Sequence, residues 1–180
     1  MAYVLPNGDE ARRWRVLLQR RTRRSSMSDY RIEKSRSPVV IKTHSGETIT
    51  GEMFLQPFAR PDGGTERPAD ILNGADPFFP VALPGGELVL VSKEQVLSLA
   101  TDAAHDDYDE RSKMARPAEI EVRLISGETH SGAILLELPA EHSRLLDFMN
   151  RENERFLTLH GSDHSLLINR RVIERVRPLD

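Results

Sequence analysis

Cysteine is absent from the 180-residue chain, and its absence excludes disulfides, thiol nucleophiles and cysteine-ligated metal sites. A cysteine-free chain suits a reducing compartment, so we expect a cytoplasmic protein, either free or peripheral to a membrane or large complex. Long apolar runs are also lacking, since segments such as Leu88–Val91 are far too short to span a bilayer. Residues Met1–Asp9 contain no apolar stretch of the kind that a secretory signal has, so we expect no such signal.

The sequence also lacks the common catalytic motifs. It has no phosphate-binding Gly loop, no Gly-x-Ser-x-Gly elbow and no His-Glu-x-x-His pair. The Gly pairs in Asp62–Gly64 and Pro84–Gly86 are typical of turns, and the acidic run Asp106–Glu110 lacks the Gly and terminal Glu of a calcium loop. The histidines show no spacing that converges on a metal. We therefore expect no enzyme activity, no cofactor and no metal site.

Charge is divided unevenly along the chain. Residues 1–42 hold 11 Lys and Arg against 4 Asp and Glu, a balance of +7. Because the whole chain holds 25 and 28, residues 43–180 hold 14 against 24, a balance of −10. A basic arm on an acidic body favours an acidic partner for the arm.

Within this arm, Glu10–Arg24 has the pattern of a basic amphipathic helix, with Trp14, Leu17, Leu18 and Arg21 on one face. Such helices bind anionic membranes, nucleic acid or acidic protein surfaces. Packing on the chain's own acidic body is the alternative. The candidate anchor residues are Arg12, Arg13, Trp14, Arg15, Leu17, Leu18, Arg20, Arg21, Arg23 and Arg24.

The rest of the chain contains an internal repeat. Ser45–Thr48 recurs as Ser126–Thr129 at an offset of 81, and Gly51 then matches Gly132. Further along, the offset becomes 77, so the first copy has four extra residues in its Pro/Gly-rich segment before Arg67. The matches at offset 77 are Arg67 with Arg144, Asp70 with Asp147, Asn73 with Asn150, Phe79 with Phe156, Val91 with Ile168 and Val96 with Ile173. This ordered series indicates a tandem duplication.

Each copy shows the same succession of elements. Alternating apolar residues predict a strand up to Thr43 or Leu124, followed by a Gly turn and a second strand. A short helix follows, which ends at Asn73-Gly74 in the first copy and begins at the N-cap Ser143 in the second. Two strands and a short closing segment complete each copy.

We therefore predict a mainly β fold with two tandem five-stranded small barrels or bent sheets, each with a short helix, and a basic N-terminal helix. The predicted divisions are a basic arm at 1–36, a first β-module at 37–100, an acidic linker at 101–116 and a second module at 117–180.

The order of these elements resembles the Sm-like small β-barrels. Asp147–Asn150 resembles the end of that family's first motif, and Leu167–Ile173 resembles its second. The resemblance implies an RNA base pocket made from Asp, Asn and an Arg-Gly pair, whose positions hold Asn169-Arg170 and Ser92-Lys93 here. The candidate ligand or RNA contacts are Asp70, Asn73, Asp147, Asn150 and Arg170. Helix capping and turn hydrogen bonds are the alternative role of the Asp and Asn side chains.

Two further resemblances bear on function. The chain resembles a poorly characterised bacterial group with a Gly-x-Leu, Arg-Leu-x-Asp-x-Leu-Asn and Ile-x-x-Val signature, which implies no activity. Arg20–Arg24 ahead of a β-barrel also resembles the layout of PilZ receptors for cyclic dinucleotides, without their downstream Asp/Asn-x-Ser-x-x-Gly element.

Three functional hypotheses follow. The leading one is a non-enzymatic adaptor or accessory subunit, in which rigid β-modules and the basic arm bind a protein partner or larger assembly. Exposed segments such as Asp76–Pro80 would add apolar contacts. The alternatives are an Sm-like RNA-binding protein and a degenerate PilZ-like receptor.

Overall fold

The computed structural model describes residues 35–103, 115–136, 145–151 and 154–179. All of these belong to one compact unit, Lys34–Asp180. The candidate anchor residues of the basic arm, the acidic run 106–110 and the predicted N-cap Ser143 lie outside the described residues.

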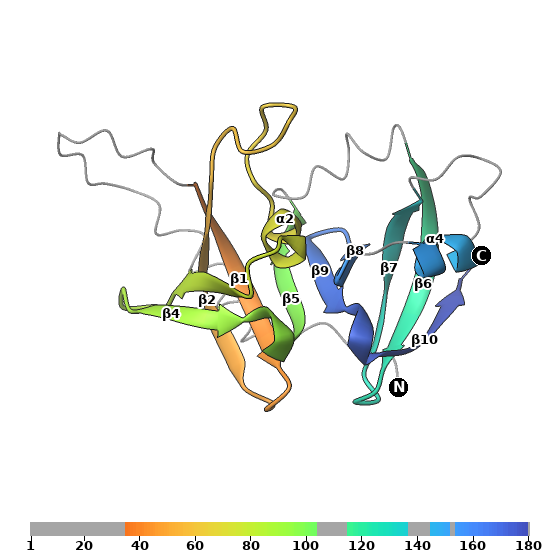
Figure 1. The fold of residues 1–180 in the computed structure, drawn as a ribbon. Helices are drawn as coiled ribbons and strands as arrows, with labels where there is room; N and C mark the ends of the chain where they lie inside the picture. The colour runs from red at the N-terminus through yellow and green to blue at the C-terminus, as the bar shows by residue number, and fades with distance from the viewer. Residues whose placement is uncertain (1–34, 104–114, 137–144, 152–153, 180) are drawn as a thin grey trace. The chain divides into compact units, whose positions relative to one another are not determined.

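The mainly β prediction is confirmed, because this part of the chain forms ten antiparallel strands in one sheet and two short α-helices (Figure 1). The first half contains β1 (Ser35–Thr43), β2 (Thr48–Leu55), α2 (Pro68–Asn73), β3 (Phe78–Ala82), β4 (Leu88–Ser92), the 3-10 turn η1 (Lys93–Gln95) and β5 (Val96–Asp102). The second half contains β6 (Arg116–Leu124), β7 (Thr129–Leu136), α4 (Leu145–Arg151), β8 (Phe156–His160), β9 (His164–Asn169), the 3-10 turn η4 (Arg170–Val172) and β10 (Ile173–Pro178).

The strand order of the sheet repeats itself. From one edge to the other it runs β10-β6-β7-β8-β9 and then β5-β1-β2-β3-β4. The two halves join where β9 pairs with β5, so that Leu167 lies opposite Leu99. In Figure 1, β5 and β9 accordingly lie side by side.

Both halves turn between their first two strands with the same geometry. Gly46 and Gly127 have φ of +84° and +88°, a conformation that glycine adopts without steric cost. Thr43 N–H donates to Glu47 O at 3.0 Å, and Leu124 N–H donates to Glu128 O at 2.9 Å. The predicted Ser-Gly-Glu turns are therefore confirmed.

A β-bulge is repeated as well. β1 pairs Lys42 with Ser98 and Thr43 with Val96, which leaves Leu97 as an extra residue in β5. β6 pairs Arg123 with Arg175 and Leu124 with Ile173, which leaves Glu174 extra in β10. A bulge bends its strand, so both closing strands bend at the same position.

Four details differ from the sequence-based expectation. β1 begins at Ser35, β5 reaches Asp102 and β6 begins at Arg116, so both ends of the predicted linker and the end of the arm belong to strands. The match of Phe79 with Phe156 is wrong by one residue. Phe78 pairs with Ser92 and Phe156 with Asn169, and both Ser92 and Asn169 immediately precede the 3-10 turn. Phe78 is therefore the counterpart of Phe156, because the β3–β4 loop is one residue longer than the β8–β9 loop.

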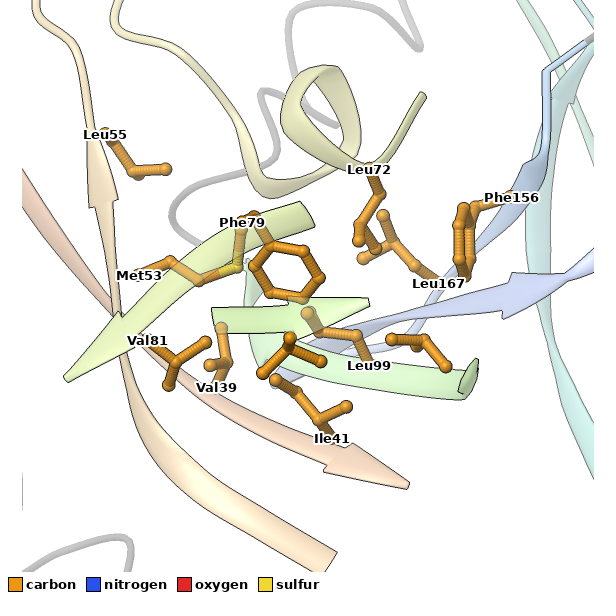
Figure 2. Close-up of a cluster of buried hydrophobic side chains, with 12 residues drawn as sticks. Val39, Ile41, Met53, Leu55, Leu72, Phe79, Val81, Leu99, Phe156 and Leu167 are labelled. Atoms are coloured by element: carbon orange, nitrogen blue, oxygen red, sulfur yellow. The ribbon is translucent and has the colours of Figure 1, made fainter. Parts of the chain in front are cut away.

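The buried side chains form two clusters, and the second half contributes to both of them. Phe156 and Leu167 pack in the cluster of the first half with Phe79 and Leu99 (Figure 2). Their chain neighbour Leu157 packs instead in the second cluster, with Ile120 and Ile134 among others. β8 and β9 are therefore buried on both faces, because one face covers the first half and the other face covers the second.

Gly51 and Gly132 mark a close approach between strands. A Cβ on Gly51 would lie 2.5 Å from Ala82 O, and a Cβ on Gly132 would lie 2.9 Å from His160 O. Both contacts are with backbone atoms, which cannot move away as the end of a flexible side chain could. These matched glycines let the second strand of each half lie against the third.

Replacing Gly51 with alanine is expected to lower the free energy of unfolding by about 1–3 kcal/mol, the usual cost of overpacking. Gly132→Ala should cost less, because its contact is longer. Urea denaturation of both variants measures the difference. A Gly51→Ala variant as stable as the wild type would contradict the close approach.

Candidate interaction surface

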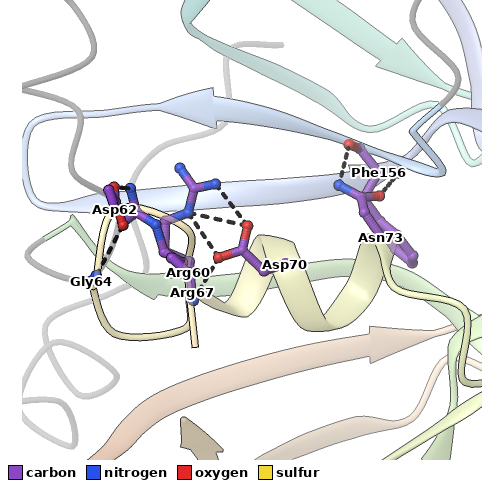
Figure 3. Close-up of polar contacts among 7 residues, drawn as sticks. All are labelled: Arg60, Asp62, Gly64, Arg67, Asp70, Asn73 and Phe156. Carbon is purple, nitrogen blue, oxygen red and sulfur yellow. Dashed lines mark hydrogen bonds and ion pairs between the residues drawn. The ribbon is translucent and has the colours of Figure 1, made fainter. Parts of the chain in front are cut away.

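Asp70 lies in the first turn of α2, where it caps the helix. Its carboxylate accepts hydrogen bonds from the Arg67 backbone N–H at 2.9 Å and from Arg67 Nη2 at 2.7 Å (Figure 3). Burial raises the pKa of Asp70, but the hydrogen bonds and charge of Arg67 outweigh burial and lower that pKa below its usual value. The side chain is thus engaged within its own helix.

Asn73 joins the two halves of the sheet. Its Oδ1 accepts a hydrogen bond from Phe156 N–H at 2.8 Å, and its Nδ2 donates to Phe156 O at 3.4 Å (Figure 3). A second amide acts at the same joint, because Asn169 Nδ2 donates to Val96 O at 3.0 Å. Sequence reasoning assigned neither residue to this role.

Arg170 and its counterpart Lys93 both bind the end of a helix. Arg170 Nη1 donates to Met149 O at 3.3 Å, and its guanidinium lies 5.4 Å from the Phe148 ring centre. Lys93 is buried, and its Nζ donates to Gly74 O at 2.9 Å. Cations at carbonyl ends stabilise helices, so this position supports α2 and α4.

The remaining candidate residues are close together but not joined. Asp147 lies half-buried in the first turn of α4, and Asn150 is exposed near its end. The structure does not bring the Asp and Asn side chains of either half onto one shared group. An RNA contact at these positions stays a prediction.

A shallow hollow of about 480 Å³ lies beside α2, lined by charged residues of the loop before it. Arg60 pairs with Asp62 there, as Arg67 does with Asp70. Each arginine of the hollow is therefore paired with a carboxylate, and Glu66 leaves the lining with a net charge of −1. Among the described residues, no three His, Asp or Glu side chains are grouped to hold a metal ion.

His130 gives the fold a pH dependence. Burial lowers the pKa of His130, and this effect outweighs the raising effect of the Glu128 carboxylate, whose Oε2 lies 3.5 Å from Nε2. The unfolded chain, with a His pKa near 6.5, then binds the proton more readily than the folded chain. Stability should therefore fall as the pH drops through 6.5 toward the lowered pKa, and this contribution levels off below it.

The measurement compares urea unfolding of wild type and His130→Gln at about pH 7.5 and about pH 5. Other groups titrate alike in both proteins, so the variant should lose less stability on acidification. An equal or larger loss in the variant would contradict the lowered pKa of the half-buried His130.

The joint between β9 and β5 shows how an edge of this sheet is covered. Phe156 and Leu167, on the face of β8–β9 that meets the first half, are 0% and 1% exposed. The facing strand β5 presents small or apolar residues, and its Ser98 is only 3% exposed.

The equivalent edge of the first half is β4, which lies at the end of the sheet in the part of the chain that the structure describes. On the corresponding face, Phe78, Leu88 and Leu90 are 54%, 57% and 69% exposed. Phe78 and Leu90 occupy the places that Phe156 and Leu167 hold in the second half. The surface formed by Phe78, Leu88 and Leu90 together with the open side of β4 is named the β4 edge below.

Among the described strands, β4 pairs only with β3, so the other side of its backbone is also open. Two backbone hydrogen bonds flank the β3–β4 pair and fix its alternation: Leu83 N–H to Glu87 O at 2.8 Å and Lys93 N–H to Pro77 O at 2.9 Å. Bonded and non-bonded pairs alternate in antiparallel strands, so Leu88 and Leu90 point their N–H and C=O groups away from β3, and Ser92 points its N–H the same way. The C=O of Ser92 accepts the first hydrogen bond of η1, of which Ser92 is the N-cap. These groups form a template for another strand.

The opposite edge, β10, is protected. Glu174, Arg175 and Arg177 are exposed along it, and it ends at Pro178. Glu174 accepts from Arg123 Nε at 3.3 Å, and Arg177 Nη2 donates to Glu121 at 3.0 Å. Charged side chains and proline are the usual means of keeping an edge from pairing.

Phe78 belongs to the segment Asp76–Pro80 that the sequence singled out, whereas the sequence analysis missed Leu88 and Leu90. The signal was present in Leu88–Val91, where four consecutive apolar residues give a strand two apolar faces, although only one faces the core. No described helix is long and apolar enough to cross a membrane. Comparison of the chain with models of known protein families, with curated proteins and with solved structures finds no match.

Proposed function

We propose that this chain is a non-enzymatic binding and assembly protein, built from two tandem Sm-like β-modules, which docks a protein partner by strand addition to the β4 edge. The observation that carries this proposal is the contrast between β9 and β4. The same strand position is covered in the second half and open in the first.

Strand addition uses both parts of the β4 edge. The outward N–H and C=O groups of Leu88 and Leu90, with the N–H of Ser92, provide main-chain hydrogen bonds, which give affinity without sequence preference. The side chains of Phe78, Leu88 and Leu90 bury apolar surface, at about 25 cal/mol per Å² removed from water. The protein partner therefore has an extended, apolar segment.

The tandem origin is supported by features that recur at matching positions. These are the strand order, the Gly46 and Gly127 turns, the bulges at Leu97 and Glu174, and the cation at Lys93 and Arg170. Chance would not repeat four unrelated local features in one order. In this proposal the basic arm adds an electrostatic contact to an acidic partner.

The test is affinity isolation of the tagged full chain from the cells that produce it. Leu90→Lys places an ammonium group on the β4 edge, where docking would have to desolvate it. Leu146→Lys is the matched control, because Leu146 is 70% exposed against 69% for Leu90. Recovery of the partner should drop about tenfold or more with Leu90→Lys, equivalent to about 1.4 kcal/mol of binding free energy or more. Recovery should not change with Leu146→Lys.

A deletion of the arm tests the electrostatic contact in the same assay. It should stop before Ser35, because Ser35 and Arg36 pair with Leu55 and Phe54 in β1–β2. The truncated chain should bind more weakly, and its binding should depend less on salt. If neither Leu90→Lys nor the deletion changes the amount of partner recovered, the proposal is overturned.

A further inference from the structure

We infer that the occupant of the β4 edge is a second copy of this chain, bound through antiparallel pairing of the two β4 strands about a two-fold axis at Leu90. This inference rests on the proposed function, which requires a partner at the β4 edge. It adds the identity of the partner, the register and the symmetry.

The β9–β5 joint within the chain shows first that β10 of another copy does not fit the β4 edge. If β4 met β10 of another copy in the register of the β9–β5 joint, Arg175 would take the place of Ser98, which is 3% exposed. The guanidinium would be buried opposite Val91 without a partner, which is costly. Pro178 would lie opposite Leu88 and could not donate a hydrogen bond. Head-to-tail growth of the sheet is therefore disfavoured by β10.

β4 is complementary to itself. With Leu90 opposite Leu90 of the second copy, Val89 lies opposite Val91, and Leu88 lies opposite Ser92. Paired residues of antiparallel strands point to the same face, so the core-facing valines of both copies stay on one side. β4 itself carries no charged residue, and Lys93, just beyond its end, is buried and donates to Gly74 O of its own chain. No like charges face each other in this register.

The hydrogen bonds agree with the same register. The outward residues Leu88, Leu90 and Ser92 of one copy meet Ser92, Leu90 and Leu88 of the other. The Leu90 pair can exchange two N–H···O bonds, and in each Leu88–Ser92 pair the Ser92 N–H can donate to Leu88 O. All three outward residues of both strands are therefore paired in the register centred on Leu90, whereas a shift by two residues would place Ser92 opposite Gly86.

The exposed apolar side chains then share one surface. Phe78 and Leu90 of both copies gather around the two-fold axis, on the face where Phe156 and Leu167 are buried in the internal joint. A two-fold interface closes on itself, and both outer edges of the resulting dimer are protected β10 strands. The assembly therefore stops at two chains.

The absence of cysteine makes a sharp test possible. In the paired register, the two Leu90 residues form a hydrogen-bonded pair with Cα atoms about 5.5 Å apart, within the range of a disulfide. Under oxidation, the single variant Leu90→Cys of the full chain should form a covalent dimer nearly completely, whereas Leu146→Cys should not. Sedimentation of the wild type should give about twice 20.4 kDa, and Leu90→Lys should give the monomer mass.

Three outcomes would overturn the inference. A monomeric wild type that still loses a cellular partner with Leu90→Lys would leave the proposed function intact and exclude the second copy. A monomer that dimerises only after removal of residues 1–33 would identify the arm as the occupant. A ladder of cross-linked species with the double variant Leu90→Cys/Val176→Cys, absent from both single variants, would show head-to-tail pairing with β10.

Discussion

Replacing Phe156 by alanine is expected to lower the free energy of unfolding by about 3–5 kcal/mol, the usual cost of removing a buried phenylalanine. The side chain is 0% exposed and packs with Leu72, Phe79 and Leu99, although it belongs to the second half of the chain. Its loss opens a cavity at the joint and leaves the apolar wall of the first half without a partner. Denaturation in guanidinium chloride measures the change.

The matched control is Phe78→Ala at the equivalent position of the first half. Phe78 is exposed, so this variant should lose less than about 1 kcal/mol when the protein is monomeric. Leu90→Lys provides the monomeric background if the wild type is a dimer. Equal losses from the two phenylalanines would contradict the unequal burial of the two strand edges.

The second large effect is expected from removing the protection of β10. The triple variant Arg175→Ser, Arg177→Ala and Pro178→Thr gives β10 the residues that β5 carries at Ser98, Ala100 and Thr101. The altered edge could then receive β4 of another copy as β5 receives β9. Since such head-to-tail contacts do not close, the variant should form long polymers.

Light scattering and sedimentation at increasing protein concentration would show this polymer growth. Adding Leu90→Lys to the triple variant should suppress it, because the pairing then lacks its other strand. A triple variant that keeps the wild-type mass would show that charge and proline do not set the behaviour of this edge.

Local signals predicted most of the strands, for physical reasons that the structure makes plain. The turns at Gly46 and Gly127 depend on a backbone conformation that few residues other than glycine adopt. The Ser-Gly-Glu sequence therefore predicts both turns. The alternation in Ile120, Val122 and Leu124 reports one buried face, and all three are buried. The end of α2 at Asn73-Gly74 was likewise readable from the sequence.

The joint could not be predicted in the same way. Pairing of β9 with β5 is a contact between segments about 70 residues apart, and no local period encodes it. The run Phe78–Phe79 offers two aromatic residues on opposite faces, and only the pairing register decides which one is buried. This ambiguity led to the match of Phe79, rather than Phe78, with Phe156.

The structural contacts of the candidate ligand residues could not be predicted from the sequence for a related reason. Asp70, Asn73 and Arg170 are residue types that recognise ligands, but the same groups cap helices and bridge strands. Their hydrogen bonds to Arg67, Phe156 and Met149 are specified by three-dimensional neighbours. The β4 edge is defined instead by the lack of a neighbouring strand among the described residues, and strand neighbours cannot be read from local sequence.

The shared interior at Phe156 also means that the two halves of the sheet, although alike in strand order, are not interchangeable. A chain with the second half first that kept the native pattern of connection would join its halves through β4 and β10. It would then enclose Arg175 in the seam and leave Phe156 and Leu167 facing water at an outer end. The order of the two halves along this polypeptide is thus part of its architecture, because each edge strand can pair only with certain neighbours.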